Sequence, residues 1–590
     1  MNYDQPMKKT LLLISLVLSG ILVNAQEKYA IGMFHFNLQY VAGDYKIETK
    51  IIRNSVYPVL QFFEKNPQYK SDIEIQGYAI ESLADDHPQV LALLKKLVNR
   101  GQIELVIAHY SDQFFIAYPA LDLQKSIEIS DQILTDHGMK RSRVFFGQEI
   151  QWTPAYATLL KDKYDLVVTS SDPHGHYRGA TLPLVNITYG NDHILGLIGA
   201  GETKLDGLWW NFSFLDDGEV FNTLDYNSDF NIVPEQEKKS IDKFKRLEKE
   251  GYKFVTMTEL ANKIKALKGY KIPDYPFVPE GTWNMSVCGP FMWMGRQRTG
   301  VEKDGLTRAL SYQMRGVIMM AERLVDYAAA KGLDVTKLKG LILEAWKHLL
   351  LSEVSDSSGW SPWLVEVQYT DNEVANADLI IKEVLKGLKA ILPMDDQNYL
   401  VNTQDGKIEP ADAQTNNPGA VSILPIPYAV RAQKCTSVIK KISENLYRID
   451  ITGERPADGA VEIEFNTPVS GLWYSAGSGE HWAVEIPTDL KNDPAFTLSN
   501  GFIFLNNGYS LIKDCSVEHI AATWKMKEQK LVFREELNKN NLEMNMRFYL
   551  LKGAVNDGLK LANRLNTWPS YKLSFAKSGI TYLKMMPENW

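Results

Sequence analysis

Cysteine is scarce in this chain, which has three cysteines among 590 residues. In an exported protein an odd number leaves at least one thiol unpaired, and no spacing of the three suggests a zinc site. A disulfide between Cys435 and Cys515 is possible, but the sequence does not decide it. Large hydrophobic cores, and not covalent cross-links, are therefore expected to hold the fold.

Long runs of basic residues are also absent. The net charge of -8 is spread along the chain, and there is no acidic tail. Nucleic-acid binding therefore lacks its usual electrostatic footprint. The hydrophobic content of 45% and the charged content of 23% are ordinary for a globular protein. A chain of this length exceeds one core, so we expect two to four domains.

One apolar run, Leu11–Val23, lies near the N-terminus. Lys8 and Lys9 precede it, and Val23-Asn24-Ala25 fits the small-residue rule for cleavage before Gln26. The run is too short and wrongly flanked for a stable membrane anchor. We expect residues 1–25 to be a signal peptide and the mature chain to be exported, periplasmic or extracellular, without a membrane span.

The stretch Trp209–Asn222 is the most informative part of the sequence. It is an aromatic run that ends in Asp216, Asp217 and Glu219. Such a run predicts a buried parallel strand, and Gly218 allows a sharp exit from it. Ligands of parallel α/β sheets gather where strands end. Half-buried acids so close together cannot all ionise at ordinary cost, so at least one pKa should rise. An acidic surface turn is the simpler alternative.

Similar units of strand, acid or histidine, and helix recur before residue 275. The first strand leads to His35, and an aromatic strand ends at Glu149. Glu104 lies inside an apolar run and must have a partner. This alternation indicates a (β/α) barrel, in which residues at separate strand ends converge on one face. The expected strands are Tyr29–Phe34, Asp72–Tyr78, Gly101–Tyr110, Val144–Pro154, Tyr164–Ser170, Trp209–Asn222 and Tyr252–Thr256, and the expected helices are Lys50–Asn66, Gln89–Arg100, Leu121–Gly138, Phe244–Glu250 and Glu259–Leu267.

Two changes in composition divide the rest of the chain. Pro273–Pro279 marks a boundary, after which three segments have helical periodicity: Leu306–Lys331, Val335–Leu351 and Asn376–Leu392. Asn402–Pro427 is rich in Asn, Pro and Gly and indicates a linker or an irregular loop, and short alternating runs after it favour a β-sandwich. The expected fold is α/β: an incomplete (β/α)7 barrel, an all-helical module and a C-terminal β-sandwich. We expect the signal peptide at 1–25, the barrel at 26–275, the helical module at 276–400, and the linker with the β-sandwich at 401–590.

Five short motifs occur in the order found in glycoside hydrolase family 57, the α-amylases and 4-α-glucanotransferases, which this chain resembles as a divergent member. The motif around Asp217 is the most specific of the five. The segment Gly281–Ser286 is also similar to one that the family carries after its barrel. The motifs are His35-Phe36-Asn37, Gly101-Gln102-Ile103-Glu104, Glu149–Pro154, Asp216–Phe221 and Ser355–Trp360.

The resemblance implies a retaining glycosidase without a cofactor. Glu149 would be the nucleophile and Asp217 the general acid/base, with their carboxyl groups ~5–5.5 Å apart. The substrate would be an oligosaccharide or polysaccharide with α-linked, glucan-like units. The helical module would complete the site through Asp356 and Trp360.

The resemblance also implies a set of substrate-binding residues. For any single tryptophan among them, a core position is the simpler interpretation. The polar members are His35, Asn37, Glu104, His109, Asp216, Glu219 and Asp356, and the aromatic members are Trp152, Trp210, Trp283 and Trp360.

Some positions depart from the family pattern. The first motif lacks its proline and has Phe36 in place of a polar neighbour, and Ser357-Ser358-Gly359 stands where aromatics are common. These departures leave open a substrate that differs from an ordinary α-1,4-glucan. The sugar, the linkage, hydrolysis or transfer, endo or exo action, the role of the β-sandwich and the oligomeric state are not predicted.

Other classes of function stay open. A metal-dependent polysaccharide deacetylase, or a mannosidase-like enzyme, needs an acid and two histidines on one metal. Asp172, His174 and His176 offer these residue types, but one short loop lacks the spacing that places two histidines on one side. A catalytically inactive carbohydrate-binding protein is the third alternative, although both carboxylates of the proposed pair are present.

Overall fold

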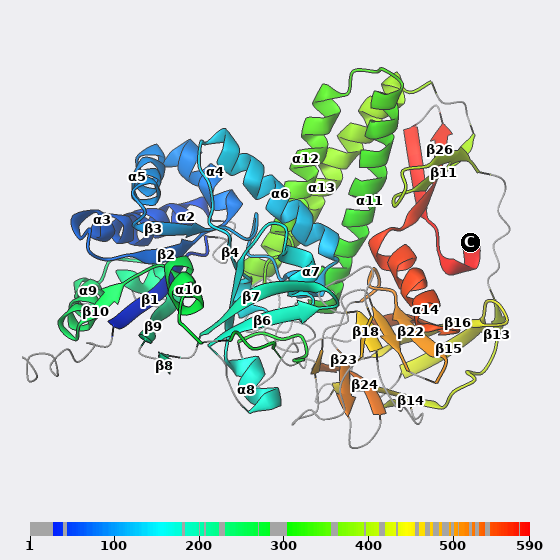
Figure 1. The fold of residues 1–590 in the computed structure, drawn as a ribbon. Coiled ribbons are helices and arrows are strands. Elements are labelled where there is room, and N and C mark those ends of the chain that lie inside the picture. Colours follow the sequence, from blue (N-terminus) through cyan, green and yellow to red (C-terminus); the bar gives the residue numbers. More distant parts are fainter. Residues whose placement is uncertain are drawn as a thin grey trace, which may run out of the picture.

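The computed structural model contains a barrel-like α/β part, three long helices and a C-terminal β region (Figure 1). Among the described residues, no helix is long and apolar enough to cross a membrane. The predicted signal peptide lies outside them. The described residues are 27–38, 44–179, 183–199, 201–205, 208–223, 230–269, 271–275, 277–283, 304–355, 364–393, 397–411, 419–431, 435–454, 460–465, 473–475, 483–485, 495–496, 501–505, 507–518, 522–525, 530–536, 543–576 and 579–590.

The strands of the α/β part form two sheets. The first has the order β3-β2-β1-β9-β8, with β10 also pairing β1, and the second has the order β4-β5-β7-β6. All pairs are parallel except the hairpins β8–β9 and β6–β7. The strands are β1 (Glu27–His35), β2 (Ser71–Glu74), β3 (Ile103–Val106), β4 (Val144–Phe146), β5 (Leu166–Ser170), β6 (Leu184–Tyr189), β7 (Asp192–Gly199), β8 (Glu202–Leu205), β9 (Leu208–Asp217) and β10 (Tyr252–Phe254).

One apolar core joins the inner faces of both sheets. It contains Met33 of β1, Val106 of β3, Phe146 of β4, Val168 of β5 and Trp210 of β9. Strands from both sheets that share one interior make the arrangement barrel-like, although the two sheets do not form a single hydrogen-bonded ring among the described residues. The parallel strands therefore end on one side, where a barrel carries its site.

Helices cover the outside of the sheets, and local sequence sets several of their ends. Thr256 and Glu259 form a capping box at the start of α10, and Pro88 occupies the first turn of α5. Gly101, with φ of 69°, ends the turn after α5 in a conformation that favours glycine. The helices are α2 (Tyr45–Ile51), α3 (Tyr57–Lys65), α4 (Gly77–Asp86), α5 (Pro88–Asn99), α6 (Ala120–Asp136), α7 (Tyr156–Leu160), α8 (Asp172–Arg178), α9 (Pro234–Lys249) and α10 (Met257–Lys265).

Three helices stand side by side next to α6: α11 (Asp304–Ala330), α12 (Thr336–Leu351) and α13 (Leu364–Ile391) (Figure 1). Their buried residues, such as Leu324 and Trp346, belong to the same core cluster as Phe63 and Leu94 of the outer barrel helices. The helical module is therefore packed against the barrel by a continuous apolar interface, and not merely linked to it.

The C-terminal strands form three sheets, of four, eight and five strands. The predicted linker Asn402–Pro427 is partly wrong, because β11 and β12 pair within this part of the chain and β11 also pairs β26. The elements are β11 (Asn398–Asn402), β12 (Ile408–Pro410), β13 (Ala420–Val421), β14 (Tyr428–Arg431), β15 (Cys435–Lys441), β16 (Leu446–Glu454), β17 (Ala460–Phe465), β18 (Trp473–Ser475), β19 (Ala483–Glu485), β20 (Ala495–Phe496), β21 (Phe502–Phe504), β22 (Tyr509–Lys513), β23 (Ala522–Lys525), β24 (Lys530–Glu536), β25 (Glu543–Lys552), α14 (Val555–Ala562), β26 (Ser570–Ala576) and β27 (Gly579–Lys584).

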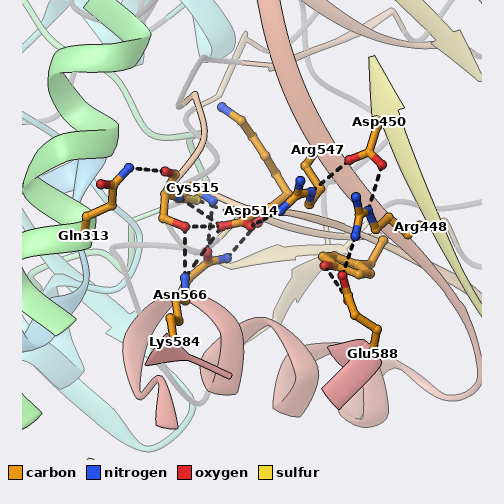
Figure 2. A network of polar contacts seen from close by, with 12 residues as sticks. Gln313, Arg448, Asp450, Asp514, Cys515, Arg547, Asn566, Lys584 and Glu588 are labelled. Atoms are coloured by element: carbon orange, nitrogen blue, oxygen red, sulfur yellow. Dashed lines mark hydrogen bonds and ion pairs between the residues drawn. The ribbon is translucent and has the colours of Figure 1, made fainter. Parts of the chain in front are cut away.

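Polar contacts join α11 to the C-terminal region. Gln313 donates to the carbonyl oxygen of Ser516 at 2.6 Å. Beside this contact, the buried carboxylate of Asp514 pairs with Lys584 at 3.6 Å and with Arg547 at 3.8 Å (Figure 2). The charges at this junction are thus matched within the C-terminal region itself.

The cysteines add no cross-link here. Cys435 and Cys515 are not joined in a disulfide, and Cys288 lies outside the described residues. Cys515 is fully buried at the junction, and burial raises the pKa of its thiol to about 12. This thiol therefore behaves as a small core side chain.

Arg315 of α11 makes buried contacts with both other parts of the molecule. Its fully buried guanidinium pairs with the equally buried Asp122 of α6 at 3.4 Å. It also donates to the carbonyl oxygen of Thr567 at 2.6 Å and to that of Asn566. One side chain thus ties the barrel, the helical module and the C-terminal region together.

We expect Arg315→Met to destabilise the folded protein by about 3–5 kcal/mol, because it leaves the buried carboxylate of Asp122 without its cation. The measurement is the midpoint of thermal unfolding. Lys238→Met, which removes an exposed pair with Asp242 on α9, is the control and should leave the midpoint nearly unchanged. Equal midpoints for Arg315→Met and the wild type would contradict this role.

Candidate active site

A buried ion pair lies at the ends of the two central strands. His35 ends β1 and is the register partner of Glu74, which ends β2, and the imidazole Nδ1 contacts the Glu74 carboxylate. Burial lowers the pKa of His35, but the charge and hydrogen bond of Glu74 and the charges of Asp112 and Asp217 together hold it well above its ordinary value. His35 is therefore an imidazolium at neutral pH.

Asp217 lies on the other side of His35. It ends β9, where the β1–β9 register pairs it with His35, and its side chain is half-buried. The chain then turns sharply at Gly218, where a Cβ atom would lie 2.5 Å from the ring of Phe36. Glycine is required at this position because any side chain would collide with that ring.

Glu219, in contrast, is 0% exposed. One carboxyl oxygen accepts the backbone N–H of Asn37, and the other has no hydrogen-bond partner within the described residues. Burial and the charge of Asp217 raise the pKa of Glu219 to about 8, although His35 and the Asn37 N–H oppose the shift. At neutral pH Glu219 is therefore mainly protonated, and its neighbour Asp217 is half-buried.

Glu149 follows β4 in an unusual backbone conformation. Its φ is 58°, and that of Ile150 is 47°. The left-handed region is costly for both residue types, above all for β-branched isoleucine. The Glu149 carboxylate accepts hydrogen bonds from the Trp283 indole at 2.6 Å, the Ser355 hydroxyl at 3.2 Å and the Gln148 amide at 3.3 Å. Donors of this kind favour the ionised form that a nucleophile requires.

The segment 278–283 lies alongside the Glu149 turn. Trp152 and Gly281 exchange backbone hydrogen bonds of 2.7 and 3.1 Å, and the Trp283 N–H donates to the Glu149 carbonyl at 3.2 Å. The Trp152 indole also donates to the carbonyl oxygen of Val278 at 3.0 Å. A segment after the barrel therefore holds the unusual turn in place.

His35 lies beside Asp217 and also next to the end of the strand that precedes Glu149. Its ring lies 5.8 Å from that of Phe146, at the end of β4, and Glu149 follows three residues later. On the Glu149 side, the backbone N–H of Ser355 donates to the Asp112 carbonyl at 2.9 Å, and the charge of Asp112 acts on His35. Asp217 is thus the register partner of His35, and Glu149 follows the strand whose last residue packs beside the same ring.

Several predicted substrate-binding residues are not where the prediction needed them. Trp152 and Trp210 are buried in separate apolar clusters and cannot form a sugar platform. Glu104 accepts hydrogen bonds from the N–H and hydroxyl of Thr258 at the start of α10, away from the strand ends. Helix N-termini favour such a carboxylate. Glu104 therefore has the partner that its burial requires, and this partner is Thr258 of the protein's own fold.

The remaining polar candidates divide by burial. His109 is enclosed by the rings of Phe115 and Phe145, and burial lowers its pKa to about 3, so it is neutral and shielded from sugar. Asn37 and Glu219 are buried and contact each other, which also contradicts a direct sugar contact for them in this structure. Trp283, by comparison, is 39% exposed and lies against Glu149.

Other predictions cannot be compared with the structure. Asp356, Trp360 and the side chain of Asp216 lie outside the described residues. The same holds for the side chains of Asp172 and His174. Within the part of the chain that the structure describes, no three His, Cys, Asp or Glu side chains form a group suited to a metal ion.

Sequence reasoning missed several residues of the site. Glu74 and Gln76 alternate with Ile73 and Ile75, a period-two signal at the end of β2 that was available. The Gln76 amide donates to Asp112 at 2.7 Å, so both lie in the network below His35. Nothing in the sequence indicates their association, which depends on strands that are distant along the chain.

Comparison with known proteins identifies a family that part of the chain resembles. Residues 26–190 match the sequence model of Glycosyl hydrolase family 57. These residues are less than a third of the chain, so it is the N-terminal part that resembles the family. The predicted resemblance is thereby confirmed.

The curated relatives of this chain align over short segments. An α-amylase of Pyrococcus furiosus is 29% identical over 118 residues, which are 20% of this chain and 18% of the relative. A 4-α-glucanotransferase of Thermococcus litoralis is 26% identical over 120 residues, again 20% and 18%. The chain thus matches about a fifth of the length of these relatives.

A solved structure resembles this chain over most of its length. An α-mannosidase from Enterococcus faecalis V583 superposes with a TM-score of 0.59 and 9% identity, covering 93% of this chain and 90% of that one. At such low identity the likeness concerns the fold alone. It supports an architecture in which barrel, helices and C-terminal β region occur together.

The raised pKa of Glu219 predicts a pH dependence of stability. Because its folded-state pKa is about 8, against an ordinary 4.5, the folded protein binds more protons between these values. The stabilising contribution is complete below the ordinary pKa and is lost as pH rises through about 8.

Glu219→Gln mimics the protonated form and should remove this dependence. Between about pH 6 and about pH 9 the melting temperature should fall more for the wild type than for the variant. Glu444→Gln, at an exposed turn, is the control and should follow the wild type. Equal slopes for Glu219→Gln and the wild type would show that Glu219 is already ionised.

Proposed function

We propose that this protein is a retaining glycoside hydrolase that acts on α-linked, glucan-like oligosaccharides or polysaccharides. Glu149 is the nucleophile and Asp217 the general acid/base. The observation that carries the proposal is that Asp217 is the register partner of His35 while Glu149, in a left-handed turn, follows the strand that ends beside the His35 ring. The match of residues 26–190 to the family model, and relatives that are an α-amylase and a 4-α-glucanotransferase, support the substrate class.

The reaction divides between the two carboxyl groups. Ionised Glu149 attacks the anomeric carbon while Asp217 gives its proton to the leaving oxygen, which breaks the glycosidic bond. Water then attacks the glycosyl ester, and Asp217 takes the water's proton as Glu149 is released. The hydrogen bonds to Glu149 support its ionised state, and the buried neighbour Glu219 limits the negative charge around Asp217 by staying protonated.

A substrate must reach both carboxyl groups from the solvent. Asp217 is half-buried, and Trp283 keeps 39% of its surface exposed next to Glu149. We propose that the sugar enters between these two residues. Export of the mature chain is part of the proposal and rests on residues 1–25 of the sequence.

We expect Asp217→Asn to lower turnover of maltohexaose by about 10²- to 10⁴-fold, because it removes the proton donor. Glu149→Gln should lower it by roughly 10⁴-fold or more, because the nucleophile is lost. Release of reducing ends is the measurement. Glu104→Gln is the matched control: its carboxylate binds Thr258, so turnover should stay near the wild-type rate provided that its melting temperature does too.

A near-wild-type rate in either Glu149→Gln or Asp217→Asn would contradict the assigned role. A defined panel of α- and β-linked oligosaccharides, including α-mannosides, would identify the sugar. Loss of activity with a chelator would favour the metal-dependent alternative, and binding of oligosaccharides without any cleavage would favour a carbohydrate-binding protein.

Retention also predicts the first product. The newly formed reducing sugar should carry the α-configuration of the bond that was cleaved, because two displacements occur at the same carbon. Proton NMR of fresh reaction mixtures, recorded before mutarotation, distinguishes the anomers. Initial release of the β-anomer would exclude Glu149 as a covalent nucleophile.

A further inference from the structure

The turn that carries Glu149 needs support from outside the barrel. Consecutive left-handed conformations at Glu149 and Ile150 are unfavourable and persist only where the surroundings determine them strongly. β4 ends at Phe146, so the strand itself does not extend to the turn. The contacts that hold Glu149 must therefore come from other segments.

Trp283 holds Glu149 at two points. Its backbone N–H donates to the Glu149 carbonyl at 3.2 Å, and its indole N–H donates to carboxylate Oε2 at 2.6 Å. The Trp152–Gly281 backbone pair aligns this segment with the turn. Thr153 adds a hydrogen bond of 2.8 Å to the buried carboxylate of Glu280. The indole is thus fixed by its own backbone before any sugar arrives.

Ser355 reaches the other carboxylate oxygen. Its buried hydroxyl donates to Glu149 Oε1 at 3.2 Å, and its backbone N–H donates to the Asp112 carbonyl at 2.9 Å. The backbone N–H of Phe114 donates to the Glu353 carbonyl at 2.8 Å in the same pairing of loops. Ser355 therefore stands on a rigid contact between the end of α12 and the loop after β3.

We propose that Trp283 and Ser355 are positioning residues that hold the Glu149 carboxylate from two sides, Trp283 at Oε2 and Ser355, beside the Gln148 amide, at Oε1, ready for attack on the anomeric carbon. The inference rests on the proposed function of Glu149. Two donors from separate elements fix both the position and the rotation of the carboxylate. Displacement reactions are sensitive to the position and orientation of the attacking oxygen relative to the anomeric carbon. Charge-assisted hydrogen bonds also favour its ionised state.

This role differs from the sugar stacking expected of an exposed tryptophan. Stacking uses the ring face, whereas positioning uses the indole N–H. Trp283→Phe keeps an aromatic face and removes the N–H, so it separates the two roles. Trp209→Phe is a matched control, because Trp209 of β9 is also partly exposed but its ring packs on two lysines. The Nζ atoms of Lys28 and Lys204 lie 4.4 and 3.9 Å from the ring centroid.

The experiment measures kcat and KM of the full-length protein with maltohexaose, or with the sugar that the oligosaccharide panel identifies, across the pH range. Trp283→Phe should lower kcat by about 10- to 100-fold, the effect of one hydrogen bond to a charged group, with KM changed much less. The acidic limb of its rate profile should move to higher pH. Ser355→Ala should shift both in the same direction, and Trp209→Phe should match the wild type.

A raised KM with unchanged kcat and an unmoved acidic limb in Trp283→Phe would overturn the proposal. Crystal structures of wild type and Trp283→Phe give a test without substrate: the Glu149 carboxylate should be displaced by about 1 Å or become disordered. An unmoved carboxylate would also overturn it. If Glu149→Gln is inactive while Trp283→Phe is fully active, the positioning role fails and the proposed function stands. If Glu149→Gln retains activity, the proposed function itself fails.

Discussion

The left-handed backbone at Glu149 and Ile150 is the constraint on which the candidate site depends. Each such conformation costs about 1–3 kcal/mol and persists only when neighbouring structure opposes relaxation. That structure is supplied by segments 278–283 and 350–355, which follow the barrel in sequence. The barrel delivers a carboxylate to its strand end, and the later parts of the chain set its orientation. The helical module is therefore part of the site and not an appendage.

At the strand ends, the cation of His35 lies among several carboxyl groups. The imidazolium at His35 contacts Glu74 and is the register partner of Asp217, while burial and the charge of Asp217 raise the pKa of the next acid, Glu219, to about 8. Two acids two residues apart thus differ in solvent access, and the buried one has the raised pKa. This is the situation in which one carboxyl group can exchange protons near neutrality while its neighbour stays fixed.

Much of the α/β part could be predicted from the sequence, because its signals are local. The aromatic run before Asp217 became β9, and the strand ends carry His35, Glu149 and Asp217 as the pattern indicated. The failures involve tertiary contacts. Trp152, Trp210 and Trp283 look alike in sequence, yet two are core and one is exposed, since burial depends on which segments pack over them. The hairpin strands β6, β7 and β8 were missed, because alternation of strand and helix does not reveal antiparallel additions.

The pairing of β11 with β26 has a consequence for how the molecule is made. The two strands are roughly 170 residues apart, so β11 emerges from the ribosome long before its partner exists. At about 5–20 residues per second the edge waits for roughly ten to thirty seconds. Until then its unpaired backbone is a template for wrong association. Biogenesis of this protein, more than its final stability, should therefore be sensitive to chaperones that shield nascent strands.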